Sequence, residues 1–270
     1  MTIATALLVA ALIALLGGTL VAVIGGLAGR AGVSSIAHAA VLLAGAFLLA
    51  ALTVRGVVAA RAPWSNLHET AIAFGFGVTA VYALLERRLA IRSLAAGVAI
   101  VGAGLVGLAL AQPDDVRPLV PALQAPLLLT VHVGTAMLAY AVGAVAFAAA
   151  IAELLQARAG GRLGWLPGAA VSRTAAYRAV LLGFPVLTAA IVLGAVWANL
   201  AWRSYWSNDP KELAAAATWL VYGGYLHVAG RRDRWGRLAP WLLILGFAAV
   251  LFTYLGAGLV FVGEHSYAGS

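Results

Sequence analysis

Cysteine is absent from this 270-residue chain, and charged residues are scarce. Without cysteine there are no disulfides, no thiolate ligands for iron–sulfur clusters and no thiolate catalysis. The chain also lacks a Cys-x-x-Cys-His segment, so it is not itself a c-type cytochrome. Charged side chains make up 10% of the residues, whereas soluble domains have about a quarter. The composition therefore excludes an ordinary water-soluble protein.

Hydrophobic residues supply 64% of the chain, and the mean hydropathy is +1.00. A membrane-spanning helix needs roughly 20 apolar residues, and eight apolar segments are visible. They are Ile3–Leu27, Val33–Val54, Thr70–Leu85, Ile91–Leu110, Leu127–Leu155, Ala179–Leu200, Leu213–Ala229 and Trp241–Val262. The first 28 residues carry no charge, and we interpret them as a span and not as a cleaved leader. The sequence predicts an all-α polytopic transmembrane bundle of about eight spans, with residues 1–270 forming a single integral membrane domain.

The net charge of +8 follows a topological pattern and does not indicate nucleic-acid binding. If both termini lie outside the cytoplasm, twelve of the 17 basic residues fall in inner loops. The five outer ones are Arg55, Arg61, Arg117, Arg203 and Lys211. The positive-inside rule favours this orientation over its inverse.

Five histidines can be sorted by their expected depth. His132 opens the fifth span on the outer side, and His265 follows the outer end of the eighth. His38 and His227 lie at the inner level, and His68 is expected in the first outer loop. Imidazole is a common ligand of haem iron, although each histidine could simply bond a neighbouring helix. The outer pair is therefore the candidate ligand set.

A tryptophan-rich segment at 197–212 lies at the same outer level. Three tryptophans (197, 202 and 206) and Tyr205 fall within ten residues. An interfacial aromatic belt explains one or two of these residues, but flat indoles also suit a flat macrocycle. If the segment is helical, Trp202, Trp206 and Asp209 share one face.

The end of this segment, residues 209–212, reads Asp-Pro-Lys-Glu, which is typical of a helix start. Such a start attracts anions, and Arg203 and Lys211 could add charge-assisted bonds to haem propionates.

Five ordered motifs together resemble the CcsA/ResC family of system II cytochrome c biogenesis proteins, whose tryptophan-rich WWD domain handles haem. The resemblance covers the chain from about Pro63 to its end. The motifs are Pro63-Trp64-Ser65-Asn66-Leu67; Val120 to Gln124 followed by His132; Trp197 to Glu212; Trp219 to His227; and Gly263-Glu264-His265-Ser266-Tyr267.

The resemblance implies a haem b held at the outer face between the axial ligands His132 and His265. It implies further haem contacts at Trp197, Trp202, Trp206, Asp209, Arg203 and Lys211, and it makes His227 one member of a transmembrane pair. It also implies a CcsB/ResB-type partner and apocytochrome c as the acceptor. The chain would be the haem-binding subunit of a cytochrome c synthase (haem lyase) complex in a cytoplasmic or thylakoid-type membrane, with its functional face outward and no certain catalytic residue.

The sequence departs from the family pattern inside the loop. Asn208 stands where the family usually has tryptophan, Arg203 where it has glycine, and Leu213-Ala214 where it has Thr-Trp. Two other classes remain open: a b-type haem electron-transfer protein that uses outer and inner histidine pairs, and a small-molecule transporter without haem. The histidine depths fit the first, and the charge-poor midplane disfavours the second.

Overall fold

The computed structural model describes residues 1–270 except 117, 120–122, 124–125, 232–235, 257–260 and 262–270. Its described part consists of helices joined by loops, and no strand occurs there. The helices are α1 (Ile3–Leu27), α2 (Val33–Ala59), α3 (Leu67–Leu89), α4 (Ala95–Leu110), α5 (Pro126–Arg158), α6 (Ala169–Trp202), α7 (Pro210–Ala229) and α9 (Ala239–Leu251). A 3-10 turn, η1 (Arg92–Leu94), precedes α4, and a π-helical turn, η3 (Phe252–Gly256), extends α9. The predicted all-α membrane fold is confirmed.

Each of the eight predicted apolar segments contains a helix in its described part, and seven of these helices are long and apolar enough to cross a membrane. The exception in the described chain is α7, which carries charged residues in its first turn and a histidine near its end. Several helices are longer than their apolar cores. For example, α6 begins at Ala169, ten residues before the predicted start, and its added turns hold polar residues such as Ser172 and Arg173.

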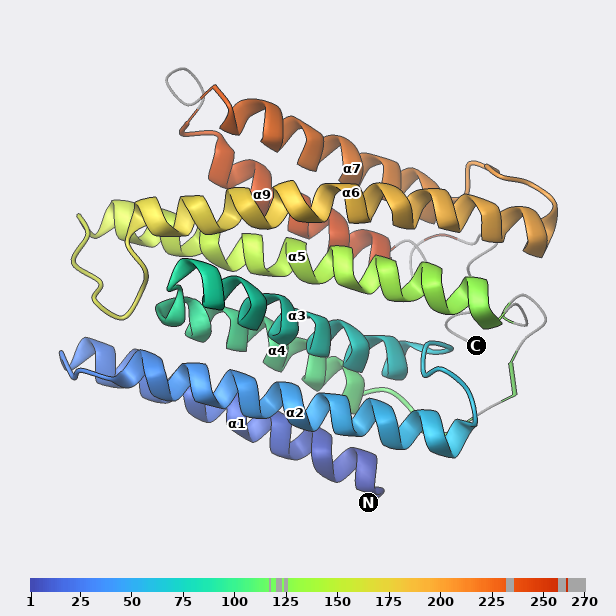
Figure 1. Ribbon diagram of the computed structural model, residues 1–270, viewed down its shortest axis with the longest axis horizontal. Coiled ribbons are helices and arrows are strands. Elements are labelled where there is room, and N and C mark those ends of the chain that lie inside the picture. Colours follow the sequence, from blue (N-terminus) through green and yellow to red (C-terminus); the bar gives the residue numbers. More distant parts are fainter. Residues whose placement is uncertain (117, 120–122, 124–125, 232–235, 257–260, 262–270) are drawn as a thin grey trace.

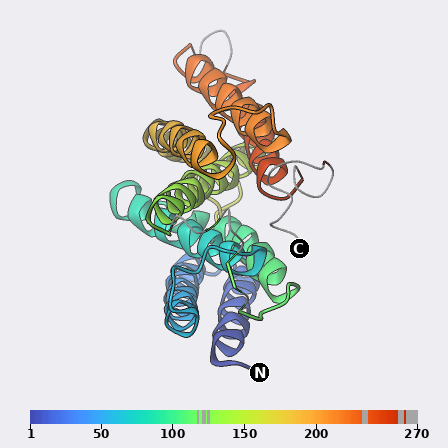
Figure 2. The same cartoon turned by 90° about the vertical axis from the view of Figure 1, so that its right-hand side faces the viewer.

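The helices lie side by side as a row of antiparallel neighbours (Figures 1 and 2). The α1–α2 hairpin lies at one side of the row, α7 and α9 lie at the other, and α3 to α6 lie between them. The chain begins at the end of the bundle that also holds the loop between α6 and α7 (Figure 1). There Thr5 donates a hydrogen bond to Asp114 in the loop after α4.

Small residues allow the helices to approach closely. A Cβ added to Gly18 of α1 would lie 2.6 Å from Cβ of Ala40 on α2, so this crossing needs glycine. Large apolar side chains face outward instead, among them Leu16, Ile24 and Leu182. This inside-out distribution is expected of a bundle surrounded by lipid, where tight packing replaces the hydrophobic effect between helices.

A buried ionic cluster fixes the segment that leads into α3. The Glu69 carboxylate is completely buried and forms salt bridges of 3.1 Å to both Arg55 and Arg61. Its Oε2 also accepts hydrogen bonds from the backbone N–H and the hydroxyl of Ser65. A carboxylate removed from water needs this many donors, so the cluster holds residues 61–69 in one arrangement.

The sequence predicts His68 in an outer loop, but the structure places it in a helix. The side chain of Asn66 caps α3 by accepting the N–H of Glu69, so the helix begins at Leu67 and His68 is in its first turn. The imidazole is 2% exposed, and its Nδ1 donates to the carbonyl of Ala109 at 2.8 Å. The prediction failed because it placed the helix start at the first apolar run and overlooked the Asn-x-x-Glu capping pattern.

Candidate functional site

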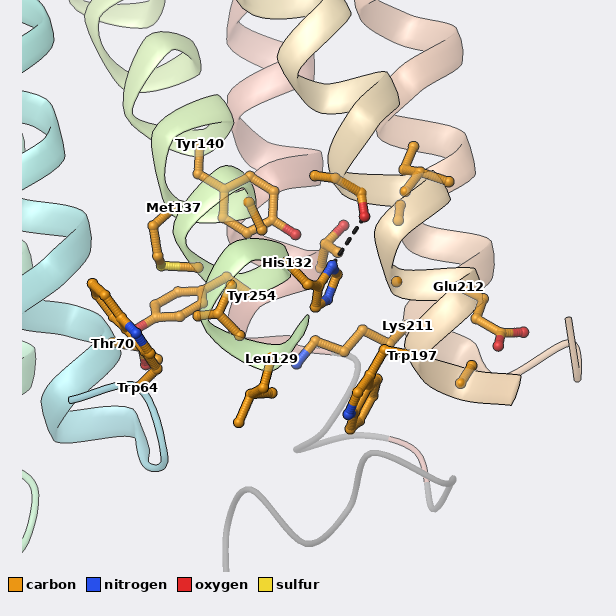
Figure 3. Close-up of a pocket in the computed structure, with 18 of the residues that line it drawn as sticks. Trp64, Thr70, Leu129, His132, Met137, Tyr140, Trp197, Lys211, Glu212 and Tyr254 are labelled. Atoms are coloured by element: carbon orange, nitrogen blue, oxygen red, sulfur yellow. Dashed lines mark hydrogen bonds between the residues drawn. The ribbon is translucent and has the colours of Figure 1, made fainter. Parts of the chain in front are cut away.

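A cavity of about 240 Å³ opens at the end of the bundle that carries the α6–α7 loop (Figure 3). Segments far apart in sequence surround it: residues 64–70, the first half of α5, the second half of α6, the loop after α6, the start of α7, and η3. Most of its wall is apolar, with a few polar groups among the aliphatic and aromatic side chains. This composition is typical of a site for a mainly apolar small molecule, although the volume is slightly below the usual range of about 300–1,000 Å³.

His132 projects from α5 into this cavity (Figure 3). Its Nδ1 lies 3.0 Å from the backbone carbonyl oxygen of Ala190 on α6. Because a carbonyl can only accept, Nδ1 is the donor, and in the neutral imidazole the lone pair is on Nε2. A second-shell bond of this kind orients metal-binding histidines, so the imidazole is held in the tautomer that an iron ligand requires.

The imidazole lies against the backbone of α6 at a glycine. A Cβ added to Gly194 would be 2.8 Å from Cε1 of His132 and 3.3 Å from its Nδ1. Trp197, one turn further along α6, is stacked with the imidazole, with ring centroids 6.1 Å apart and planes inclined by 9°. The two flat rings are therefore nearly parallel at the wall of the cavity.

Trp197 and Trp202 form a small aromatic cluster beside the cavity. Trp197 is 2% exposed, and its ring meets that of Trp202 edge to face at 5.0 Å between centroids. Leu123 and Leu129 pack against the same cluster. Trp197 lines the cavity, whereas Trp202 supports Trp197 from behind.

The loop after α6 is not helical, so the expected shared face of Trp202, Trp206 and Asp209 does not form. Arg203 ends α6 with a φ of 63°, in the left-handed conformation where glycine is favoured. Asn208 also has a positive φ, of 60°, and its side chain accepts a hydrogen bond from the indole N–H of Trp206. Two of the departures from the family pattern, Arg203 and Asn208, thus occupy the positions of positive φ in the loop.

Asp209 and Glu212 start α7 as the sequence predicted. Asp209 is the N-cap and accepts from the N–H of Lys211, while the Glu212 carboxylate accepts from the N–H groups of Asp209 and Ser207. This capping box fixes the position of Lys211. The Lys211 side chain extends from the first turn of α7 to the cavity (Figure 3), and burial lowers the pKa of its ammonium while the charge of Asp209 opposes that shift.

The remaining predicted residues lie elsewhere. Trp206 lines the cavity, but Arg203 and Asp209 shape the loop without lining it. His265 lies outside the described residues. His227 is exposed near the other end of α7, and His38 on α2 bonds Tyr82 at 2.9 Å. Because α2 and α7 lie on opposite sides of the helix row (Figures 1 and 2), the two inner histidines are not brought together.

Sequence analysis missed several residues of the cavity. Trp64 faces it from the segment before α3, and its buried indole N–H has no acceptor among the described residues. Tyr140 and Tyr254 line it deeper in the bundle, and the Tyr254 hydroxyl is 3.0 Å from that of Thr70. Trp64 belongs to the Pro63–Leu67 motif, so the sequence offered a signal for it. The two tyrosines carry no such signal, because they come from helices that only the fold brings together.

Comparisons with known proteins relate this chain to cytochrome c assembly proteins. A family model described as cytochrome C assembly protein matches residues 64–265. The cytochrome c biogenesis protein CcsA of Synechococcus elongatus is 33% identical, with 87% of this chain and 88% of that protein covered. CcsA of Parasynechococcus marenigrum is 34% identical, with 87% of each chain covered.

One solved structure, titled Cytochrome c Heme Lyase CcmF, superposes with a TM-score of 0.73 at 24% identity. The match covers 94% of this chain but only 47% of that one, so this chain spans about half of its length. At this level of sequence identity, the superposition shows that the two proteins share a fold.

Proposed function

This chain belongs to the cytochrome c assembly protein family, and we propose that it holds haem b at the cavity of His132 and presents it to apocytochrome c. The chain is an integral membrane protein of cytochrome c biogenesis. The proposal concerns which residues hold the haem, on which face of the membrane, and with which partner. The observation that carries it is the Nδ1 contact of His132 with Ala190, because that contact leaves the iron-binding lone pair on Nε2.

The residues of the cavity fit a haem as cargo. His132 would supply one axial ligand, and the apolar wall with Trp197 would contact the macrocycle. Lys211 would meet a propionate, whose negative charge would also be stabilised by the N-terminus of α7. His265 would supply the second axial ligand, which follows from the family resemblance alone.

A haem in this cavity would be partly enclosed, and its outer edge would stay accessible. That geometry suits covalent attachment, in which each cysteine S–H of the apocytochrome adds across a vinyl C=C bond of the haem, with no atom lost. The chain would supply binding and orientation, which hold the reacting groups near one another, while the reactive groups belong to the cargo and the acceptor. Tyr205 and Trp206, which are 61% and 44% exposed, would form the surface that the acceptor meets.

His227 supports the proposed need for a second membrane protein. It is exposed near the end of α7 that lies opposite the cavity. An ionisable side chain on the lipid-facing surface of a bundle is costly unless a partner covers it. A CcsB/ResB-type partner would provide the other histidine of a transmembrane pair. Residues 1–270 would then act as one integral membrane domain of a synthase complex, with the cavity facing outward from a cytoplasmic or thylakoid-type membrane.

The test is the visible spectrum of the detergent-purified protein, co-expressed with a CcsB/ResB-type partner. His132→Gly should abolish the bis-histidine spectrum, and free imidazole should restore it by occupying the vacated ligand position. His38→Gly, which removes an imidazole from the inner level, is the matched control and should leave the spectrum unchanged. A spectrum that survives His132→Gly, or a folded wild-type protein that carries no haem, would refute the proposal.

A further inference from the structure

A second depression lies at the opposite end of the bundle from His132. This open groove of about 790 Å³ is formed by the last turn of α3, the turn into α4, and α6. Four arginines and one glutamate line it, so its formal charge is strongly positive. The groove plays no part in the proposed haem site.

Most of this positive charge is not neutralised within the protein. Glu86 pairs with Arg92 at 2.9 Å. Arg87, Arg88 and Arg178 form no salt bridge with any carboxylate in the part of the chain that the structure describes. Three guanidinium groups therefore line one groove without a salt-bridge partner among the described residues.

Helix electrostatics explain only part of this cluster. Arg87 and Arg88 lie in the last turn of α3, where cations offset the negative end of the helix dipole. That explanation does not extend to Arg178, which lies in the N-terminal third of α6 and reaches the same groove. The convergence of basic side chains from two helices indicates a shared anionic ligand.

Exposed leucines lie near the groove arginines on the same two helices, α3 and α6. Leu84 on α3 is 60% exposed, and Leu181 and Leu182 on α6 are 47% and 67% exposed. They lie about one helical turn from the arginines, on the membrane side of them. An anion site bordered by exposed apolar surface on its membrane side has the shape of a phospholipid, with a phosphate at the interface and acyl chains beyond it.

We propose that this groove binds the phosphodiester headgroup of an anionic phospholipid, whose acyl chains lie along α3 and α6. Planar guanidinium groups bind phosphate oxygens through paired hydrogen bonds, and basic pockets between transmembrane helices recognise such headgroups. A soluble phosphate would use the arginines but would leave the leucine surface uncovered. The charge complementarity and the adjoining apolar surface together favour the lipid.

The experiment measures lipid binding to the full-length protein in detergent by native mass spectrometry. Phosphatidylglycerol is compared with phosphatidylcholine of the same acyl chains. The groove variant is Arg87→Gln with Arg178→Gln. The control is Arg158→Gln with Arg162→Gln, which removes the same charge from exposed arginines outside the groove. Each arginine near an anionic headgroup contributes about fivefold in affinity, so the groove variant should bind phosphatidylglycerol about 30-fold more weakly while the control keeps the wild-type affinity.

Three results would overturn the proposal. Equal binding of the two lipids would show that no anion is recognised. An equal loss in both double variants would reduce the effect to general surface charge. Competition by soluble glycerol phosphate at the same concentrations as the lipid would make the groove a site for free phosphate. The haem spectrum of the groove variant should stay at wild type, so this test is independent of the test of the haem site.

Discussion

Gly194→Ala should weaken haem binding although residue 194 contributes no side chain. The added methyl would lie 2.8 Å from Cε1 of His132, whereas carbon atoms in contact prefer about 3.5–4.0 Å. The imidazole must therefore move by about 0.7–1.2 Å, which breaks its 3.0 Å bond to the carbonyl of Ala190. Loss of a second-shell bond typically reduces metal affinity by about 10–100-fold, and we expect a loss in that range.

The assay is haem retained per protein after purification, determined from the absorption spectrum. Gly134→Ala is the matched control, because it lies on α5 two residues from His132 and a Cβ there meets nothing within 4 Å. In a His132→Gly background without added imidazole the ring is absent, so Gly194→Ala should have no further effect on the haem that remains bound. Wild-type haem content in Gly194→Ala, an equal loss in Gly134→Ala, or an undiminished effect in the His132→Gly background would each refute the reasoning.

Two further predictions concern the supports of the site. Glu69→Gln leaves the buried Arg55 and the partly buried Arg61 without their carboxylate and should lower the free energy of unfolding by about 3–5 kcal/mol, measured by chemical unfolding in detergent. The control Glu86→Gln, whose arginine partner is 59% exposed, should cost less than about 1 kcal/mol, and equal costs would contradict the buried-cluster argument. Arg203→Gly relieves a left-handed φ of 63° and should raise the thermal midpoint by an amount equivalent to about 1 kcal/mol. A lower midpoint would mean that the Arg203 side chain stabilises the loop by more than the backbone strain costs.

The loop between α6 and α7 illustrates why the family pattern alone predicted the site incompletely. Arg203 and Asn208 stand where the family usually has glycine and tryptophan. In the fold they stand at two left-handed turning points, and no helical face exists there. Asparagine tolerates this conformation better than most residues, and its amide also holds the Trp206 indole. Backbone conformation therefore accounts for Asn208 without any reference to haem contact.

The cavity wall was partly predictable. Sequence motifs identified His132, Trp197, Trp206 and Lys211, all of which line it. They could not identify Tyr140 or Tyr254, because a tyrosine within an apolar helix carries no local sign of the face it presents.

The sequence by itself determined the properties that depend on nearest neighbours along the chain. Apolar length set the positions of the helices, and the Asp209-Pro210-Lys211-Glu212 run set the start of α7. Tertiary structure alone decided which helices meet. It placed the Ala190 carbonyl opposite His132, buried Glu69 between two arginines, put His38 and His227 on opposite sides of the bundle, and brought Arg178 to the end of α3. The physical reason is that hydropathy and capping act over a few residues, whereas helix packing in lipid depends on the close fit of surfaces that are distant in the sequence.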